Sequence, residues 1–228
     1  MTMKRNIANY IDHTNLKPDA AKKDIARLCR EAKKYGFASV CVNPCRVEQC
    51  AKLLKGSKVK VCAVIGFPLG ASDTAVKLFE AASAIANGAE ELDLVVNQAW
   101  LKEGSPALAT ELALFVKSSR DFGRENKRKV VLKLILECCN LTEDEIVAGC
   151  KAAVAAGFDF VKTSTGFAKG GATVEDVALM RKTVGRKCGV KAAGGIRDRA
   201  TALAMIAAGA NRLGTSSGPK LVVSASGS

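Results

Sequence analysis

The chain repeats one local pattern of apolar and polar positions. An alanine-rich helical segment ends at a glycine, and a short run of β-branched residues follows, as around Gly36, Gly88, Gly157 and Gly209. Glycine just past a helix is a common left-handed stop, and strands alternating with helices of this length indicate a parallel sheet. The pattern predicts eight strands, near 10–14, 38–43, 60–66, 90–96, 130–137, 159–164, 189–193 and 211–215.

Helical periodicity fills the segments between these strands. Asp19, Ser72, Thr142, Thr173 and Asp198 are placed to cap or open helices at the first turn. Eight such units predict an α/β fold, a closed (β/α)8 TIM barrel, with a doubly wound open sheet as the alternative. The helices are expected near 18–35, 45–55, 73–87, 106–123, 142–156, 174–185 and 198–208, with a short piece after 217.

The domain organisation follows from the absence of any break in this alternation. No linker composition interrupts it, so residues 1–223 are expected to form a single barrel domain. The last residues, 224–228, are small and polar and are expected to be a disordered tail.

The four recurring glycines also measure position along the strands that follow them. If those strands begin at equal heights, residues at the same distance from each glycine lie at one level and point to one face. We expect that face to be the barrel interior, near the carboxyl ends of the strands where active sites of this fold lie. Five residues beyond the glycines stand Cys41, Asp93, Lys162 and Gly214.

Lys162 lies inside one of the most β-prone segments, FDFVKTSTG at 158–166. Burying an ammonium is costly unless it finds a partner or loses its proton. A neutral lysine amine attacks carbonyl groups to form a Schiff base. The simpler interpretation is a lysine whose stem is buried and whose head reaches solvent at the strand end.

Three more charged residues, Asp93, Lys133 and Lys191, interrupt predicted core strands. Four inward charges are hard to explain by packing, because each one lowers stability. A structural cluster of salt bridges is one interpretation. In the other, Lys191 keeps the amine of Lys162 nucleophilic, and Asp93 exchanges protons with bound intermediates. The second interpretation predicts a lysine-dependent aldolase that needs no metal and no organic cofactor.

Glycine-rich turns follow the last three predicted strands. Gly194-Gly195 follows strand 7, and residues 214–218 follow strand 8. Backbone N–H groups in such turns can approach an anion, and the loops after strands 7 and 8 are a common phosphate site of this fold. The loop that begins at Gly166 could close over the same site. The turns therefore predict a small phosphorylated substrate.

The charge and cysteine content exclude several other classes. The net charge of +13 suits an anionic partner, but aromatic residues are only 5% of the chain, which disfavours stacking on nucleic acid. The nine cysteines include no CxxC pair and His13 is the only histidine, which disfavours zinc and favours reduced thiols. No apolar run approaches the roughly 18 residues of a membrane span, so a cytoplasmic protein without a membrane partner is expected.

Several motifs of the chain match a known family. The strings KTSTGF at 162–167 and GFPLG at 66–70 are the most specific, and segments 11–14, 39–44, 91–95, 171–173, 190–196 and 214–218 also match. On these residues the chain resembles the deoxyribose-phosphate aldolases over nearly its whole length. The resemblance implies a TIM barrel that reversibly cleaves 2-deoxy-D-ribose 5-phosphate to D-glyceraldehyde 3-phosphate and acetaldehyde.

The resemblance also implies roles for individual residues. Lys162 would be the Schiff-base lysine, Lys191 the proton donor and acceptor that perturbs it, and Asp93 the acid of the proton relay. It implies no cofactor and no metal. Positions that match the family's substrate and phosphate pocket are Asp12, Cys41, Lys133, Gly166, Gly194, Gly195, Ser216 and Ser217.

Some features depart from the family or stay open. Asn15 stands where leucine is common, the turn 97–100 is unusual, and the chain lacks the terminal tyrosine that reaches the active site in some members. We expect a homodimer or higher homo-oligomer, although the sequence does not fix the number of subunits. The alternative enzyme is another Schiff-base aldolase or transaldolase acting on a phosphorylated sugar. The alternative outside enzymes is a basic nucleic-acid-binding protein.

Overall fold

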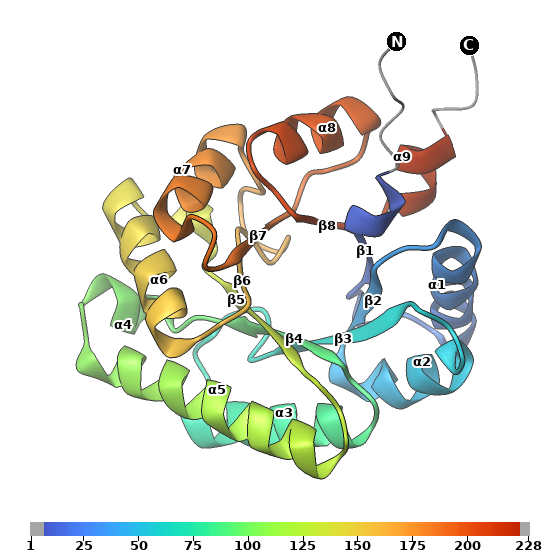
Figure 1. Ribbon diagram of the computed structural model, residues 1–228, viewed down its shortest axis with the longest axis horizontal. Helices are drawn as coiled ribbons and strands as arrows, with labels where there is room; N and C mark the ends of the chain where they lie inside the picture. Colours follow the sequence, from blue (N-terminus) through green and yellow to red (C-terminus); the bar gives the residue numbers. More distant parts are fainter. Residues whose placement is uncertain (1–6, 224–228) are drawn as a thin grey trace.

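Eight parallel strands close into a barrel in the order in which they occur along the chain (Figure 1). The structure is a computed structural model that describes residues 7–223, so the expected tail at 224–228 lies outside the described residues. The predicted TIM barrel is confirmed and the open sheet is wrong. The strands are β1 (Ile11–Asn15), β2 (Ser39–Val42), β3 (Lys60–Ile65), β4 (Glu91–Val95), β5 (Val131–Ile135), β6 (Phe160–Lys162), β7 (Gly189–Ala193) and β8 (Arg212–Thr215).

Helices surround the strands and cover the outer face of the barrel (Figure 1). They are α1 (Lys22–Tyr35), α2 (Val47–Leu54), α3 (Thr74–Ala86), α4 (Gln98–Lys102), α5 (Pro106–Glu125), α6 (Glu143–Ala156), α7 (Val174–Val184), α8 (Arg199–Ala207) and α9 (Gly218–Val223). Short 3-10 turns occupy Ala8–Tyr10, Pro44–Arg46 and Cys138–Asn140. The predicted helices match these bounds within four residues, whereas α4 was not predicted. None of the described helices is long and apolar enough to cross a membrane.

The helix ends show which local signals decide the boundaries. Thr142, Thr173 and Asp198 accept hydrogen bonds from backbone N–H groups in the first turns of α6, α7 and α8, as predicted. Asp19 and Ser72 do not cap a helix, because α1 and α3 begin further along the chain. The recurring glycines take left-handed backbone angles at the helix ends, with φ from 68° to 116°.

The pairing register places most of the inward side chains in three layers, each contributed by alternate strands. Val, Ile and Leu usually fill these layers. Here most of the members are polar or charged. The layer nearest the carboxyl ends of the strands contains Cys41, Asp93, Lys162 and Gly214, which is the set that the glycine spacing predicted. The middle layer contains Asp12, Cys62, Lys133 and Lys191, and the third contains Ser39, Glu91, Phe160 and Arg212.

The apolar core lies between the outer face of the barrel and the helices. Strand residues that point outward, such as Leu92, Leu132 and Val190, have no exposed surface and belong to one large cluster with the buried faces of the helices. This shell holds the barrel closed without using its interior. The interior positions are therefore available for chemistry.

Candidate active site

The side chain of Lys162 projects from the carboxyl end of β6 into the barrel. Its Nζ atom lies 2.8 Å from Oδ2 of Asp93, and only 3% of the side chain is exposed. Lys191 Nζ lies 2.7 Å from the same carboxylate oxygen. The predicted convergence of these three side chains is confirmed, and the interpretation of Lys162 as a strand-end lysine with a solvated head is wrong.

Beneath Lys162, six charged groups form a closed ring of ion pairs. Among these six groups each acid contacts two cations and each cation contacts two acids. The contacts are Asp93 to Lys133 at 2.8 Å, Lys133 to Glu91 at 2.6 Å, Glu91 to Arg212 at 2.8 Å, Arg212 Nε to Asp12 at 2.8 Å, Asp12 to Lys191 at 2.6 Å, and Lys191 to Asp93 at 2.7 Å.

The ring is neutral by itself, because it contains three carboxylates and three cations. Lys162 is a fourth cationic side chain that shares Asp93 but brings no further acid. Burying a net charge at low dielectric is costly. The buried cluster therefore has no net charge only when Lys162 is an amine.

The pKa values of Asp93 and Lys191 are shifted toward their charged forms. Burial alone would raise the pKa of Asp93, but Lys133, Lys162 and Lys191 hold it well below its usual range. Burial would likewise lower the pKa of Lys191, but Asp12 and Asp93 hold it above its ordinary value. Lys191 is therefore a permanent cation near neutral pH, and Asp93 a permanent anion.

Two thiols lie beside the ring, Cys41 on β2 and Cys62 directly opposite it on β3. Cys62 Sγ donates to Asp93 Oδ1 at 3.1 Å and accepts from Lys133 Nζ at 3.4 Å. One ligand atom from each thiol and one from Asp93 lie within 4.8 Å of one another, a spacing that could hold a metal ion. A divalent cation there would face the ammonium of Lys133 and compete with it for Asp93. We therefore assign no metal site to this group.

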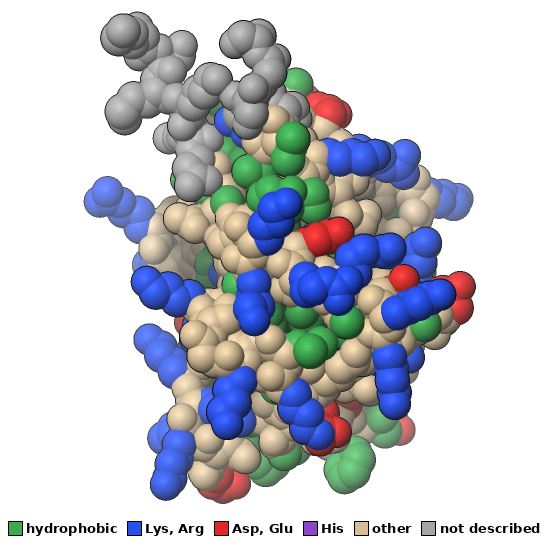
Figure 2. Space-filling model, turned by 90° about the vertical axis from the view of Figure 1, so that its right-hand side faces the viewer, with side chains coloured by type: hydrophobic (Ala, Val, Ile, Leu, Met, Phe, Trp, Pro, Cys, Tyr) green, Lys and Arg blue, Asp and Glu red, His purple; other side chains and the backbone are tan. Residues whose placement is uncertain are grey.

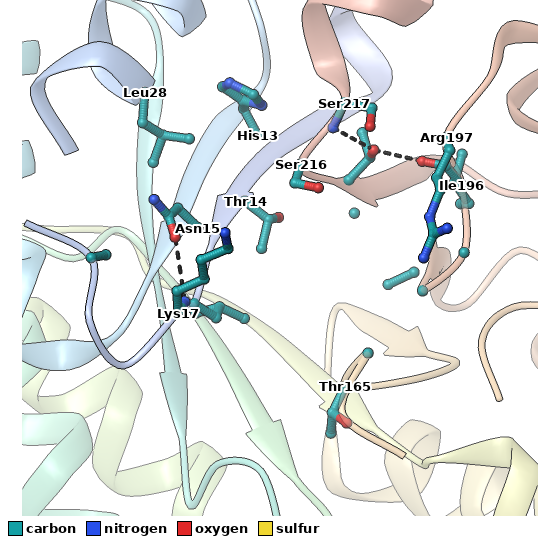
Figure 3. A pocket seen from close by; sticks show the side chains of 18 of the residues that line it. His13, Thr14, Asn15, Lys17, Leu28, Thr165, Ile196, Arg197, Ser216 and Ser217 are labelled. Atoms are coloured by element: carbon teal, nitrogen blue, oxygen red, sulfur yellow. Dashed lines mark hydrogen bonds between the residues drawn. The ribbon is translucent and has the colours of Figure 1, made fainter. Parts of the chain in front are cut away.

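Lys162 is one of the residues that line a cavity of about 790 Å³, and Figure 3 shows this cavity from close by. The loops after β1, β6, β7 and β8 form its walls together with one side of α1. Its lining includes the predicted positions Gly166, Gly194, Gly195, Ser216 and Ser217.

Asp12, Cys41 and Lys133 do not belong to this lining. All three are fully buried, and Asp12 and Lys133 are members of the ring beneath Lys162. Their predicted contact with a substrate stays a prediction. In this structure Asp12 contacts Lys191, and Lys133 contacts Asp93.

The loops after β6 and β7 approach each other closely enough to require glycine. A Cβ atom on Gly171 would lie 2.4 Å from the carbonyl oxygen of Gly194. Gly194 and Gly195 both have left-handed backbone angles, with φ of 88° and 79°. Their backbone N–H groups can therefore line the cavity without side chains in the way.

The loop after β8 is tied to the same wall through Thr215. Its hydroxyl donates to the carbonyl oxygen of Ile196 at 2.7 Å and accepts from the backbone N–H of Ser217 at 2.9 Å. Two basic side chains, Lys17 and Arg197, line the cavity on opposite sides in Figure 3. Two serine hydroxyls, a glycine-rich turn and two cations make this end of the cavity suited to an anion.

Four residues of this arrangement were not predicted from the sequence: Glu91 and Arg212 in the ring, and Lys17 and Arg197 at the cavity. A signal existed for the first two. Glu91 lies two positions before Asp93, and Arg212 two positions before Gly214, so each pair shares one face of its strand. Because residues two positions apart on a strand point to the same face, the inward positions of Asp93 and Gly214 would have placed Glu91 and Arg212 inside the barrel.

Basic side chains spread over the face that carries α1 and α2 (Figure 2). They do not gather into one tract, and some have acidic partners, as Lys52 has Glu48 at 2.5 Å. This distribution is that of a solvated basic surface. The cavity with its buried amine remains the strongest candidate site.

Comparisons with known proteins point to one family. The family model described as DeoC/LacD family aldolase matches residues 7–221. The chain is 57% identical over 220 residues to the deoxyribose-phosphate aldolase of Geobacillus sp. (strain WCH70), and 56% identical over 222 residues to that of Thermococcus kodakarensis, with 96% of each chain covered in both comparisons. The tetrameric deoxyribose phosphate aldolase of Aeropyrum pernix has a similar structure, with a TM-score of 0.87, 36% identity, and 96% and 90% of the two chains covered.

The ring generates a prediction about stability. Arg212→Met or Glu91→Gln alone leaves an unpaired buried charge, so each should lower the free energy of unfolding by about 3–5 kcal/mol. The double variant removes one charge of each sign, so its loss should be smaller than the sum of the two by about 1–3 kcal/mol. Urea unfolding at pH 7 measures all three.

The exposed pair Lys52 and Glu48 provides the matched control. The same double-mutant cycle there, with Lys52→Met and Glu48→Gln, should give a coupling below about 0.5 kcal/mol. Additive losses at Arg212 and Glu91 would show that the two are not members of one charge-balanced unit.

Proposed function

The chain belongs to the DeoC/LacD family of aldolases, and we propose that Lys162 is the residue through which it acts on 2-deoxy-D-ribose 5-phosphate. The enzyme is a deoxyribose-phosphate aldolase of class I, which reversibly cleaves this sugar to D-glyceraldehyde 3-phosphate and acetaldehyde. The observation that supports the role of Lys162 best is its position. It is the basic side chain outside the neutral ring, and among the basic groups of that cluster it lines the cavity.

The chemistry starts with attack of the Lys162 amine on C1 of the open-chain sugar. Loss of water from the carbinolamine gives an iminium ion. Removal of the proton from the C3 hydroxyl then breaks the C2–C3 bond, which releases glyceraldehyde 3-phosphate and sends the bonding electrons to the iminium as an enamine. Protonation of the enamine at C2 and hydrolysis of the new iminium return acetaldehyde and the free amine.

Asp93 and Lys191 set the electrostatics of these steps. The cationic iminium nitrogen forms where the amine lies, 2.8 Å from the Asp93 carboxylate. That carboxylate stabilises the cation and can hold the water that exchanges protons with it. Lys191 contacts the same oxygen and opposes a second ammonium at Lys162, which keeps the amine nucleophilic between turnovers.

The phosphate of the substrate is proposed to bind at the far end of the cavity. Backbone N–H groups of Gly194 and Gly195 and the hydroxyls of Ser216 and Ser217 line that end, with Gly166 at the adjoining loop. Lys17 and Arg197 add positive charge. Anchoring the phosphate there would orient the aldehyde end toward Lys162.

We also propose that the chain forms a homo-oligomer through an apolar surface on α3. Val76 and Phe79 are 56% and 79% exposed and lie three positions apart on that helix, and Leu69 in the preceding loop is 74% exposed. Large exposed apolar side chains in a cluster mark interaction surfaces. A second copy of this chain is the proposed occupant, because the Aeropyrum pernix relative is tetrameric.

The cysteines support the proposed compartment. All nine are free, and most of them are buried. Unpaired thiols persist in reducing environments. We therefore propose that the enzyme is cytoplasmic.

Trapping tests the role of Lys162. Acetaldehyde with borohydride should add an ethyl group to Lys162 and to no other lysine of the cluster, because its amine faces the cavity. Lys162→Met should abolish the label and lower the rate of glyceraldehyde 3-phosphate release by about 10³-fold or more. Peptide mass spectrometry and a coupled assay measure these. Equal labelling of the wild type and of Lys162→Met would refute the assignment.

The charge balance generates a prediction about pH. Lys191→Leu removes a ring cation, so three carboxylates then face three basic groups and a protonated Lys162 is favoured. The acidic limb of the kcat/KM profile should move to higher pH, and turnover at neutral pH should fall by about 10²-fold. An unchanged limb position would remove Lys191 from the mechanism.

The apolar surface on α3 generates a prediction about assembly. Phe79→Asp places a charge at the centre of the proposed interface and should shift the oligomer toward monomer, as measured by sedimentation at micromolar concentration. Leu203→Asp on α8 is the control, because Leu203 is 37% exposed but lies outside this surface. If the Phe79→Asp variant sediments with the same assembly mass as the wild type, the subunits associate through another surface or do not associate.

A further inference from the structure

Glu137, two residues beyond the end of β5, has an unusual backbone conformation. Its φ and ψ are both 60°, in the left-handed region that side chains other than glycine rarely adopt. Within residues 7–223 the other such non-glycine residue is Lys127, which is exposed in a turn. Strain of this kind persists when the surrounding contacts impose it, and it often marks a functional position.

The side chain of Glu137 is a buried acid without a basic partner. It is 2% exposed, and no salt bridge to it occurs within the described part of the chain. This separates it from Asp12, Glu91 and Asp93, each of which contacts at least two basic groups. A buried carboxylate of this kind needs hydrogen bonds to both oxygens.

Both hydrogen bonds come from Thr165. The backbone N–H of Thr165 donates to Oε1 of Glu137 at 3.1 Å, and its hydroxyl donates to Oε2. The hydroxyl oxygen also accepts from the backbone N–H of Phe167 at 3.1 Å. The Glu137 carboxylate therefore holds Thr165 directly, and it holds Phe167 through the Thr165 hydroxyl.

The fixed segment forms part of the cavity wall. Thr165, Gly166 and Phe167 all line the cavity, next to Lys162. The ring of Phe167 packs edge-on against that of Phe67, from the loop after β3, with 5.2 Å between the centroids. The path of this segment therefore sets both the direction of the Gly166 N–H and the position of an aromatic side chain at the barrel mouth.

We propose that Glu137 is a positioning residue for the phosphate end of the cavity, acting through Thr165 on Gly166 and Phe167. The left-handed backbone turns its side chain from the end of β5 toward the loop after β6. The carboxylate is required because both of its oxygens accept from donors, whereas a glutamine amide offers one acceptor and one donor group. This inference rests on the proposed function only in identifying the bound anion as the substrate's phosphate.

Two substitutions at Glu137 separate strain from positioning. Glu137→Gly relieves the left-handed strain and removes the carboxylate, whereas Glu137→Gln keeps the side-chain shape and loses one acceptor. Both should raise KM for 2-deoxyribose 5-phosphate about tenfold, because a hydrogen-bonded charge is lost. The kcat/KM for unphosphorylated 2-deoxyribose should fall by a smaller factor, about twofold at most.

Variants at Thr165 and Lys127 complete the design. Thr165→Val keeps the backbone donor and loses the hydroxyl, so it should weaken phosphate binding, and Thr165→Ser should recover most of that loss. Lys127→Gly removes the other strained side chain, far from the cavity wall, and should leave both substrates unaffected. If Glu137→Gly fails to fold, the Thr165 pair still decides the matter.

Calorimetric titration with inorganic phosphate provides a readout that does not need turnover. The affinity of the protein for inorganic phosphate should fall about tenfold in both Glu137 variants, while borohydride trapping of acetaldehyde on Lys162 stays efficient. A wild type that does not cleave 2-deoxyribose 5-phosphate would overturn the proposed function but leave this titration valid. Unchanged phosphate affinity, or equal losses with both sugars, would overturn the role of Glu137.

Discussion

Charge balance inside a closed barrel is the constraint on which the structure of this site depends. The interior layers, which are apolar in most barrels of this kind, contain a ring of three acids and three cations. Such a cluster is tolerated only when every charge meets an opposite one, because burial removes the charges from bulk water. The apolar shell between strands and helices supplies the stability that the interior does not.

This constraint supports the proposal that one lysine differs in reactivity from its neighbours. Lys133 and Lys191 are each held between two carboxylates and stay charged, with pKa values raised above the ordinary range despite burial. Lys162 has a share of one carboxylate and lies at the layer nearest the cavity. Under the proposed assignment, position along the strand and the count of acids select Lys162 as the nucleophile.

Much of this arrangement could be predicted from the sequence, because the glycine-marked repeat fixes both the barrel and the heights of its strands. Lys162, Asp93 and Lys191 were recognisable as charges inside β-prone runs. Arg212 and Glu91 were not predicted, because each is the first residue of its strand, where a charged side chain is usually exposed to solvent. Glu137 could not be recognised, since neither a left-handed backbone angle nor burial beyond a strand end leaves a periodic signal. The five-residue α4 is too short to show helical periodicity.

The contact between Arg212 and Asp12 joins the first and last strands of the barrel across 200 positions of sequence. Until β8 docks against β1, Asp12 and Glu91 each lack one of their two cations, and the six-membered circuit is open. A partly assembled barrel would thus hold uncompensated charge in a half-formed interior, which is a strongly unfavourable state. Closing the sheet and neutralising its centre are consequently a single event, and this architecture penalises every intermediate that stops one strand short.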